Sequence, residues 1–372
     1  MSETPILDLE LEPPKLRRPW LAYLLGGVIG ALIGFYLADR IDSLWWLPIL
    51  YVSVAVHEVG HLIAAKLVGM EAGGIVIGGL VIFKSGSRWL TRFEWRRILS
   101  GGLFKPLPRK GDFDPARYAW MVAGGPLATA LLIGTGGIAF WRSPAGAGGW
   151  LGTLWWINVA LGILCLLPSR GVNKSDGARL WQLLRHPEEA RSAMALLQLQ
   201  TEETAGVQPR DWDAGLFEEM LKGDPKAGES SYRQMLAFYR RIDEGNEAAA
   251  LLHLENALAR SGCCGRLVKH WCFLEAACSS AIIRGDPEKA RTWLARATRL
   301  RKPQSKHGLE AAIAMSEKRY EDAVRHWDAA LADLAKRKLD SGLARFGKAK
   351  IAEYQSRCRE AIELAADPAA AG

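Results

Sequence analysis

Four apolar stretches constrain the fold of this chain more than any other feature. The first, Trp20–Ala38, contains no charged residue, and the second, Leu44–Met70, is interrupted by only a few ionisable side chains. The third covers Ala119–Trp141 and the fourth Trp150–Leu167. A helix of about 20 apolar residues crosses a bilayer core. The sequence therefore predicts about four transmembrane helices. Trp20–Ala38 is expected to be a retained anchor, because its apolar run is too long for a signal peptide and lacks a convincing cleavage site.

The tryptophan content supports this interpretation. The chain contains 15 tryptophans, which is high for its length. Indole rings favour the boundary between membrane and water, because one end of the ring system is apolar and the other polar. Several tryptophans stand at the ends of the apolar stretches: Trp20, Trp45, Trp46, Trp120, Trp141 and Trp150.

The distribution of basic residues predicts the orientation of the spans. The chain has 48 Lys and Arg against 40 Asp and Glu, a formal charge of +8. Most basic residues between the spans lie in the Glu71–Tyr118 connection, and the other two connections carry only Arg40 and Arg142. Cytoplasmic loops are enriched in Lys and Arg. We therefore expect both termini and this connection to be cytoplasmic, in a bacterial-type plasma membrane. No nucleic-acid-binding module is recognisable, so the charge favours a membrane surface and not nucleic acid.

The Glu71–Tyr118 connection has the pattern of strands. Small and β-branched residues alternate around Val76–Phe83, and the RWLTRFEW segment continues the pattern. We expect a small β-sheet inserted between two spans. An open edge of such a sheet can pair with an extended peptide, although most glycine-rich hairpins are only turns. The sequence leaves both alternatives open.

The motif HEVGH lies within the second apolar stretch. Residues four apart share one face of a helix, so His57 and His61 can bind the same metal ion. Glu58 lies one step round the helix and can act as general base on a water at that metal. Counting from Trp46 at about 1.5 Å per residue places His57 near the middle of the bilayer. Because buried ionisable groups in membranes are usually functional, we favour a zinc site over a structural polar cluster.

A zinc hydrolase needs a third protein ligand and one open position. Asp176 stands out because it follows the fourth apolar stretch, just before Gly177. The competing interpretation is that Ser175 and Asp176 only cap the helix that begins there. The spacing alone does not separate a zinc ligand from a cap.

The order of three motifs resembles the site-2 protease family of intramembrane zinc metalloproteases. HEVGH is followed by Gly124-Gly125-Pro126 on the next apolar stretch and then by LLP and SDGARL after the fourth. The resemblance covers about the N-terminal half of the chain. It implies that His57, His61 and Asp176 bind zinc and that Glu58 is the catalytic base. It also implies cleavage of peptide bonds within or near the transmembrane helix of a substrate.

The chain departs from the family pattern around the substrate. Cys165 stands directly before LLP, where the family usually has asparagine, and Thr129 replaces the asparagine that usually follows Gly-Pro. The proline often found before Asp-Gly is absent, and no PDZ-like insertion is visible. Asn158, two helical turns before Cys165, and Asn173 are the alternative amide donors for substrate backbone or an oxyanion.

The second half of the chain reads as a soluble helical domain. Thr201–Asp213 and Gly223–Ser231 have loop composition, and three similar helical segments follow, with aligned alanines at Ala250, Ala290 and Ala323. The second interval is close to the 34 residues of a tetratricopeptide repeat and the first is longer. The pattern resembles degenerate tetratricopeptide helix pairs, with an unrelated helical bundle as the alternative. Such arrays usually bind peptides or partner proteins.

The expected organisation is mainly α: a polytopic helical membrane domain with a small sheet insertion, followed by a soluble helical repeat domain. The predicted segments are a cytoplasmic tail at 1–19, the membrane zinc metalloprotease domain at 20–185, a linker with connecting helices at 186–231 and the repeat domain at 232–372.

Other possible ligands in the second half show no metal-binding spacing. The four cysteines near His270 match no zinc motif and are expected to be reduced thiols: Cys263, Cys264, Cys272 and Cys278. The remaining histidines also lack a partner at ligand spacing: His186, His253, His307 and His326.

We therefore expect an intramembrane zinc endopeptidase that cleaves membrane-protein substrates, with a cytoplasmic repeat domain that docks substrate or a regulator. The alternative is a catalytically inactive membrane adaptor that binds partners through its repeats. The intact HEVGH and Asp176 argue against it, because a silent core has no need of buried polar groups. A metal carrier requires further polar residues along the spans, and few are present.

Overall fold

The computed structural model describes residues 46–95, 101–109, 114–142, 150–167, 174–262, 264–300 and 306–366. These residues form two compact units, an N-terminal unit that ends at Thr201 and a C-terminal unit that begins at Glu202. Helices predominate in both units. The first predicted span, Trp20–Ala38, lies outside the described residues.

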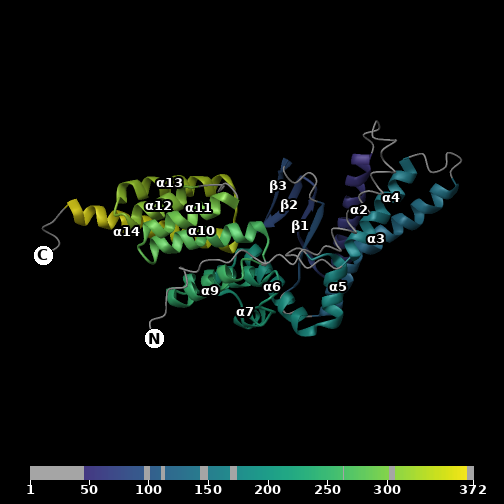
Figure 1. The fold of residues 1–372 in the computed structure, drawn as a ribbon, viewed down its shortest axis with the longest axis horizontal. Helices are drawn as coiled ribbons and strands as arrows, with labels where there is room; N and C mark the ends of the chain where they lie inside the picture. The colour runs from purple at the N-terminus through teal and green to yellow at the C-terminus, as the bar shows by residue number, and fades with distance from the viewer. Residues whose placement is uncertain are drawn as a thin grey trace. The chain divides into compact units, whose positions relative to one another are not determined.

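Three apolar helices form the centre of the N-terminal unit: α2 (Trp46–Leu67), α3 (Pro115–Arg142) and α4 (Trp150–Leu166). Each contacts the other two, and they lie side by side in Figure 1. Helix α2 approaches α3 closely at two glycines, since a Cβ added at Gly60 would lie 2.5 Å from the carbonyl oxygen of Gly124. Glycine at the crossing allows two helix backbones to come this near.

Two of these helices are long and apolar enough to cross a membrane, Trp46–Leu67 and Pro115–Ala139. Helix α4 is also apolar but has only 17 residues, which is short for an untilted span. The prediction of about four transmembrane helices is therefore supported at two positions and not confirmed as a whole.

The predicted sheet insertion is present between α2 and α3. Its four antiparallel strands lie in the order β3-β2-β1-β4. Gly78 and Gly86, at φ angles of 54° and 60°, occupy the two tight turns, where a left-handed backbone favours glycine. Strands β1 and β4 contact helix α2. The strands are β1 (Glu71–Ile77), β2 (Leu80–Ser85), β3 (Arg88–Phe93) and β4 (Gly102–Leu107).

Two further helices, α5 (Asp176–Arg185) and α6 (Pro187–Ala205), complete the N-terminal unit and pack on its core. Helix α6 continues through residues 201–205, which were expected to form a loop. Its last turn is held by the burial of Thr204, and the helix ends at Gly206 with φ of 97°. The expectation of a loop from Thr201 was therefore wrong at its start, because local composition did not reveal the buried face.

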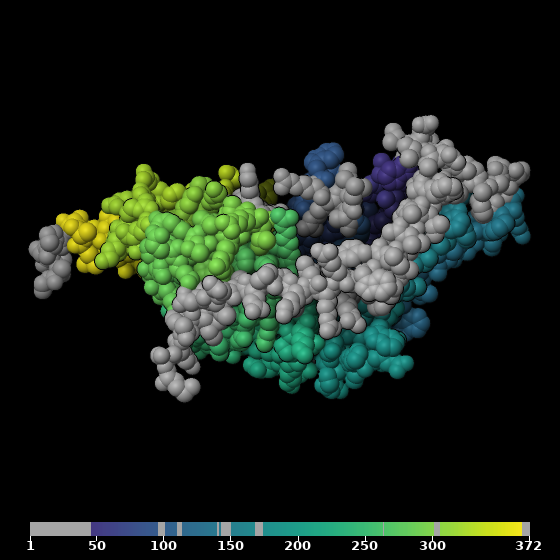
Figure 2. Space-filling model, viewed as in Figure 1, coloured from purple at the N-terminus to yellow at the C-terminus, as the bar shows by residue number. Residues whose placement is uncertain are grey.

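The C-terminal unit consists of paired helices. Helices α8 and α9, α10 and α11, and α12 and α13 pack pairwise, and α10 also contacts α8 and α12. Figure 2 shows the surface of this unit, which runs from teal through green to yellow. The helices are α7 (Ala214–Leu221), α8 (Ser230–Asp243), α9 (Glu247–Ala259), α10 (Arg266–Ile282), α11 (Pro287–Leu300), α12 (His307–Ser316), α13 (Tyr320–Lys336) and α14 (Gly342–Ala366).

The three aligned alanines lie in the second helix of each pair. Ala250, Ala290 and Ala323 are fully buried, in α9, α11 and α13 respectively. A methyl side chain at these positions lets the two helices of a pair approach closely. Stacked helix pairs agree with the expected repeat pattern, and the assignment to tetratricopeptide repeats stays a prediction.

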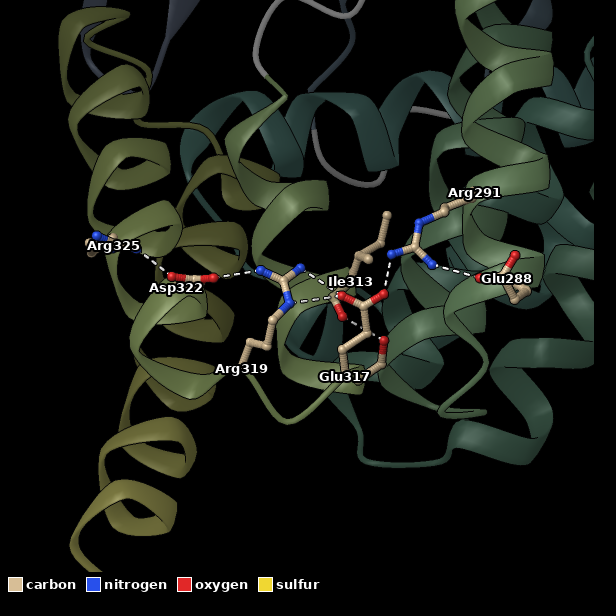
Figure 3. Close-up of polar contacts among 8 residues, drawn as sticks. Glu288, Arg291, Ile313, Glu317, Arg319, Asp322 and Arg325 are labelled. Atoms are coloured by element: carbon tan, nitrogen blue, oxygen red, sulfur yellow. Dashed lines mark hydrogen bonds and ion pairs between the residues drawn. The ribbon is translucent and has the colours of Figure 1, made fainter. Parts of the chain in front are cut away.

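A network of exposed charges joins consecutive pairs (Figure 3). Glu317, which follows α12, accepts hydrogen bonds from Arg291 of α11 and from Arg319 before α13, the latter at 2.6 and 3.0 Å. Asp322 accepts one from Arg319 at 2.5 Å and another from Arg325. Because exposed ion pairs contribute about 1 kcal/mol or less each, this network orients the α12–α13 turn more than it stabilises the fold.

Candidate metal centre

Helix α2 carries the HEVGH motif with all three functional side chains in its buried face. His57, Glu58 and His61 are 4%, 5% and 6% exposed. The three residues share the same face because a helix repeats after 3.6 residues. Asp176 is the first residue of α5, and α5 contacts both α3 and α4.

The structure brings Asp176 to the two histidines across 119 residues of sequence. The Oδ2 atom of Asp176 lies 3.1 Å from Nε2 of His57 and 3.5 Å from Nε2 of His61. The two Nε2 atoms are 3.2 Å apart. A tetrahedral zinc ion with bonds of about 2.1 Å holds its ligand atoms about 3.4 Å apart. The three atoms therefore have the separation that one zinc ion requires.

The Nδ1 atom of each imidazole forms a hydrogen bond with a residue of α3. Nδ1 of His61 lies 3.0 Å from the backbone oxygen of Met121, and Nδ1 of His57 lies 2.8 Å from Oγ1 of Thr129. Nδ1 of His61 also lies 3.3 Å from the backbone nitrogen of Gly125. In the tautomer that donates from Nδ1 to the Met121 carbonyl, Nε2 of His61 presents a lone pair. Two imidazole nitrogens and one carboxylate oxygen therefore face one point, and this set of ligand atoms fits zinc.

Glycines in α3 make room for the two imidazoles. A Cβ at Gly125 would lie 2.3 Å from Nε2 of His61 and 2.6 Å from Nε2 of His57. The preceding Gly124 sits where α3 crosses α2, as described above. Gly124 thus allows the two helix backbones to approach, and Gly125 leaves space for the Nε2 atoms of His57 and His61.

The start of α5 separates the two interpretations of Ser175 and Asp176. Ser175 is the N-cap: its hydroxyl accepts from the backbone N–H of Ala178 at 3.3 Å and donates to the carbonyl of Leu167 at 2.5 Å. Asp176 is left with its carboxylate directed at the histidines. Gly177 packs against the end of α4, where a Cβ would lie 2.0 Å from the carbonyl oxygen of Leu166. A glycine there allows α5 to begin close enough for Asp176 to reach them.

Strand β4 forms a wall of the site beside Glu58. A Cβ at Gly102 would lie 2.1 Å from Oε1 of Glu58, and the Phe104 ring stacks on that of His61 with centroids 6.4 Å apart. Oε2 of Glu58 is buried and has no hydrogen-bond partner among the described residues. A buried carboxylate oxygen without a partner is costly for folding and is available to a water or substrate.

Of the two predicted amide donors, Asn158 lies among the described residues and Asn173 does not. Asn158 is fully buried in α4, and its Nδ2 donates to Oγ of Ser53 at 3.0 Å and to the carbonyl of Leu154 at 2.8 Å. Its Oδ1 has no hydrogen-bond partner in the part of the chain that the structure describes. Cys165, directly before Leu166 at the end of α4, places Sγ 3.8 Å from Nε2 of His57.

The cysteines of the C-terminal unit do not form a second metal group among the described residues. Cys272 is fully buried, and the nearby His270 places Nδ1 3.0 Å from the carbonyl oxygen of Ala297. Cys263 lies outside the described residues.

Sequence reasoning missed three parts of the site. Thr129 was recognised only as a departure from a family pattern, and its contact with His57 was not expected. The carbonyl of Met121 carries no side-chain signal at all, and the approach of Gly102 to Glu58 depends on how the sheet docks on α2. Only Thr129, four residues after Gly125 and so on the same helix face, had a signal that could have identified it.

The family model of peptidase family M50, the site-2 protease family, matches residues 45–142. This range holds HEVGH, the sheet, Gly124-Gly125-Pro126 and Thr129, and it ends before Asp176. No curated protein and no solved structure matches the chain. The match supports an intramembrane metallopeptidase in general, and together with the two apolar helices it suggests a membrane protein.

Proposed function

We propose that this chain, whose residues 45–142 match peptidase family M50, is an intramembrane zinc endopeptidase that cleaves within or near transmembrane segments of membrane proteins. The observation that supports this most strongly is the meeting of His57, His61 and Asp176 at mutual distances of 3.1 to 3.5 Å. These atoms come from two helices and provide the nitrogen and oxygen ligands of a catalytic zinc site.

His57, His61 and Asp176 hold the metal in this proposal. Zinc, when bound, supplies a Lewis acid that polarises the scissile carbonyl and lowers the pKa of a bound water. Glu58 removes a proton from the attacking water and then delivers it to the leaving amine nitrogen. A substrate helix must unwind locally, because its carbonyl oxygens are otherwise hydrogen-bonded within the helix. Asn158 can contribute an amide to the substrate only by releasing Ser53 or Leu154.

The C-terminal unit is proposed to dock a substrate or a regulatory protein. Stacked helix pairs form extended surfaces that suit protein partners. The chain is proposed to be a multi-pass protein of a bacterial plasma membrane, and the distribution of basic residues supports an orientation with both termini in the cytoplasm. No nucleic-acid partner is proposed.

Replacing Glu58 with glutamine tests the mechanism. Glu58→Gln keeps the size of the side chain but cannot accept the proton of water, so purified protein should retain wild-type zinc and lose cleavage of a membrane-embedded test substrate. Zinc is measured by atomic absorption and cleavage by the appearance of product. A Glu58→Gln variant that cleaves at the wild-type rate would remove Glu58 from the mechanism.

Replacing a histidine tests the ligand set. His57→Ala should lose the zinc of this site, since two protein ligands remain where three were present. The same measurement on His253→Ala, a histidine of α9 that bonds Gln234, is the control and should match wild type. Full retention of zinc by His57→Ala would exclude His57 as a ligand.

A further inference from the structure

A second group of metal-ligating side chains lies in the C-terminal unit. His307 is the first residue of α12, Glu310 lies one turn later on the same face, and His326 comes from α13. One ligand atom from each residue lies within 4.8 Å of the others. The two helices form one pair and run side by side in Figure 1.

The carboxylate of Glu310 stands between the two histidines. Its Oε2 lies 3.6 Å from Nδ1 of His307 and 3.5 Å from Nδ1 of His326. The imidazole rings are stacked, with centroids 5.8 Å apart and an angle of 28° between their planes. Ligands of one tetrahedral zinc ion are about 3.4 Å apart, so small side-chain rotations suffice to place all three atoms around an ion.

The Nδ1 atom of His307 adds an independent observation. It is shielded from solvent and makes no hydrogen bond with any described residue. A buried imidazole nitrogen without a partner lowers the stability of the fold, and a metal ion supplies the missing partner. The three side chains are otherwise partly exposed, at 42%, 40% and 36%, which leaves room for water to complete the coordination.

We propose that His307, Glu310 and His326 bind a divalent transition-metal ion that links α12 to α13. Two imidazoles and one carboxylate are ligands typical of zinc, and hard cations such as Mg²⁺ prefer oxygen. This site is separate from His57, His61 and Asp176 and does not depend on the proposed protease activity. Its expected effect is on the stability of the helix pair, because an ion that binds only the folded state stabilises it.

The test uses the full, untagged chain in detergent with His57→Ala in the background, so that zinc at HEVGH does not contribute. Equilibrium dialysis against micromolar zinc should give one ion per chain, and thermal melting should shift upward on addition of zinc. Adding His326→Ala should abolish both effects. Adding His253→Ala, which changes a histidine outside the group, should leave both unchanged.

Each outcome is decisive for the proposal. If the chain with intact His326 binds no more zinc than the His326→Ala chain, the group is an ion pair only and the proposal is overturned. Loss of zinc equally in His253→Ala would show unspecific binding and would also overturn it. Circular dichroism of both variants separates loss of the site from loss of the fold. Glu310→Gln, which keeps both imidazoles, should bind zinc more weakly and show a smaller thermal shift.

Dialysis of wild-type protein is run beside the His57→Ala chains. If His57 does not hold zinc, the wild-type and His57→Ala chains bind equal amounts, whereas the zinc that depends on His326 persists. If the second site fails, only the His326-dependent ion is missing. The two results are therefore distinguishable in the same dialysis experiment.

Discussion

At the scale of single residues, the groups behind His57 and His61 decide how the imidazoles face a metal. Thr129 is fully buried, and its Oγ1 lies 2.8 Å from Nδ1 of His57. Such partners fix the ring and the position of its proton, and their loss weakens metal binding about 10- to 100-fold.

Thr129→Val tests this role, because valine has nearly the shape of threonine and lacks the hydroxyl. We expect zinc affinity to fall about 10- to 100-fold, as measured by competition with a chelator. Thr135→Val is the matched control, since Thr135 lies in the same helix and its exposed hydroxyl bonds only the carbonyl of Leu131 at 2.8 Å. Equal affinities for the two variants would contradict a positioning role of Thr129.

Replacing Gly125 tests whether the Nε2 atoms of His57 and His61 need the space beside this glycine. A methyl group there would lie 2.3 Å from Nε2 of His61, so Gly125→Ala should displace the imidazoles and lose zinc. Gly134→Ala is the control, because no atom lies within 4 Å of its added Cβ and alanine favours the helix. Zinc content and circular dichroism measured together separate loss of the site from unfolding. Wild-type zinc in Gly125→Ala would show that the histidines lie elsewhere.

At the scale of elements, α8 and α10 meet at a buried acid. Tyr239 of α8 donates to Oε1 of Glu275 in α10 at 2.5 Å, and the indole of Trp271 donates to the oxygen of Tyr239 at 2.7 Å. Burial raises the pKa of Glu275, although its hydrogen bonds with Tyr239 and Trp271 oppose the shift.

The raised pKa of Glu275 predicts a pH dependence of stability. The folded state holds the proton of Glu275 more tightly than the unfolded state, whose glutamates titrate near pH 4.3. The free energy of unfolding should therefore fall as pH rises from about 4.3 through the folded-state pKa. Glu275→Gln cannot ionise and should melt at a higher temperature than wild type, by a margin that grows with pH.

Thermal melting of wild type and Glu275→Gln over this pH range shows whether the stability difference grows or shrinks as pH rises. The exposed Glu363→Gln in α14 is the control and should follow wild type at every pH. A margin that shrinks as pH rises would show that ionised Glu275 is stabilised in the folded protein, contrary to its raised pKa.

At the scale of the whole molecule, two kinds of helix packing serve two environments. The N-terminal unit places its polar groups inside a cluster of apolar helices, and α2 and α3 expose large apolar side chains such as Ile63 and Leu131. The C-terminal unit buries alanines between paired helices and carries exposed ion pairs outside. Burying polar groups and exposing apolar ones suits a lipid surrounding, and the reverse suits water.

Local repetition explains what could be predicted from sequence. The spacing of His57 and His61 requires only one helix. The alanines at Ala250, Ala290 and Ala323 mark a packing pattern that recurs in each successive helix pair. The apolar stretches that became α2, α3 and α4 were recognisable for the same reason, since length and composition are local properties.

Contacts between residues far apart in sequence depend on tertiary structure. Residue spacing could not show whether Asp176 caps a helix or faces the histidines. The packing of α5 answers this, because Ser175 caps the helix and the carboxylate of Asp176 lies beside His57. The group of Glu310 and His326 also arose from the pairing of two helices, without any sequence motif. The amino-acid sequence is sufficient to predict the apolar helices and the shared helix face of His57 and His61, because both depend on local periodicity. The approach of Asp176 to the two histidines and the grouping of His307, Glu310 and His326 depend on long-range packing, which local periodicity does not encode.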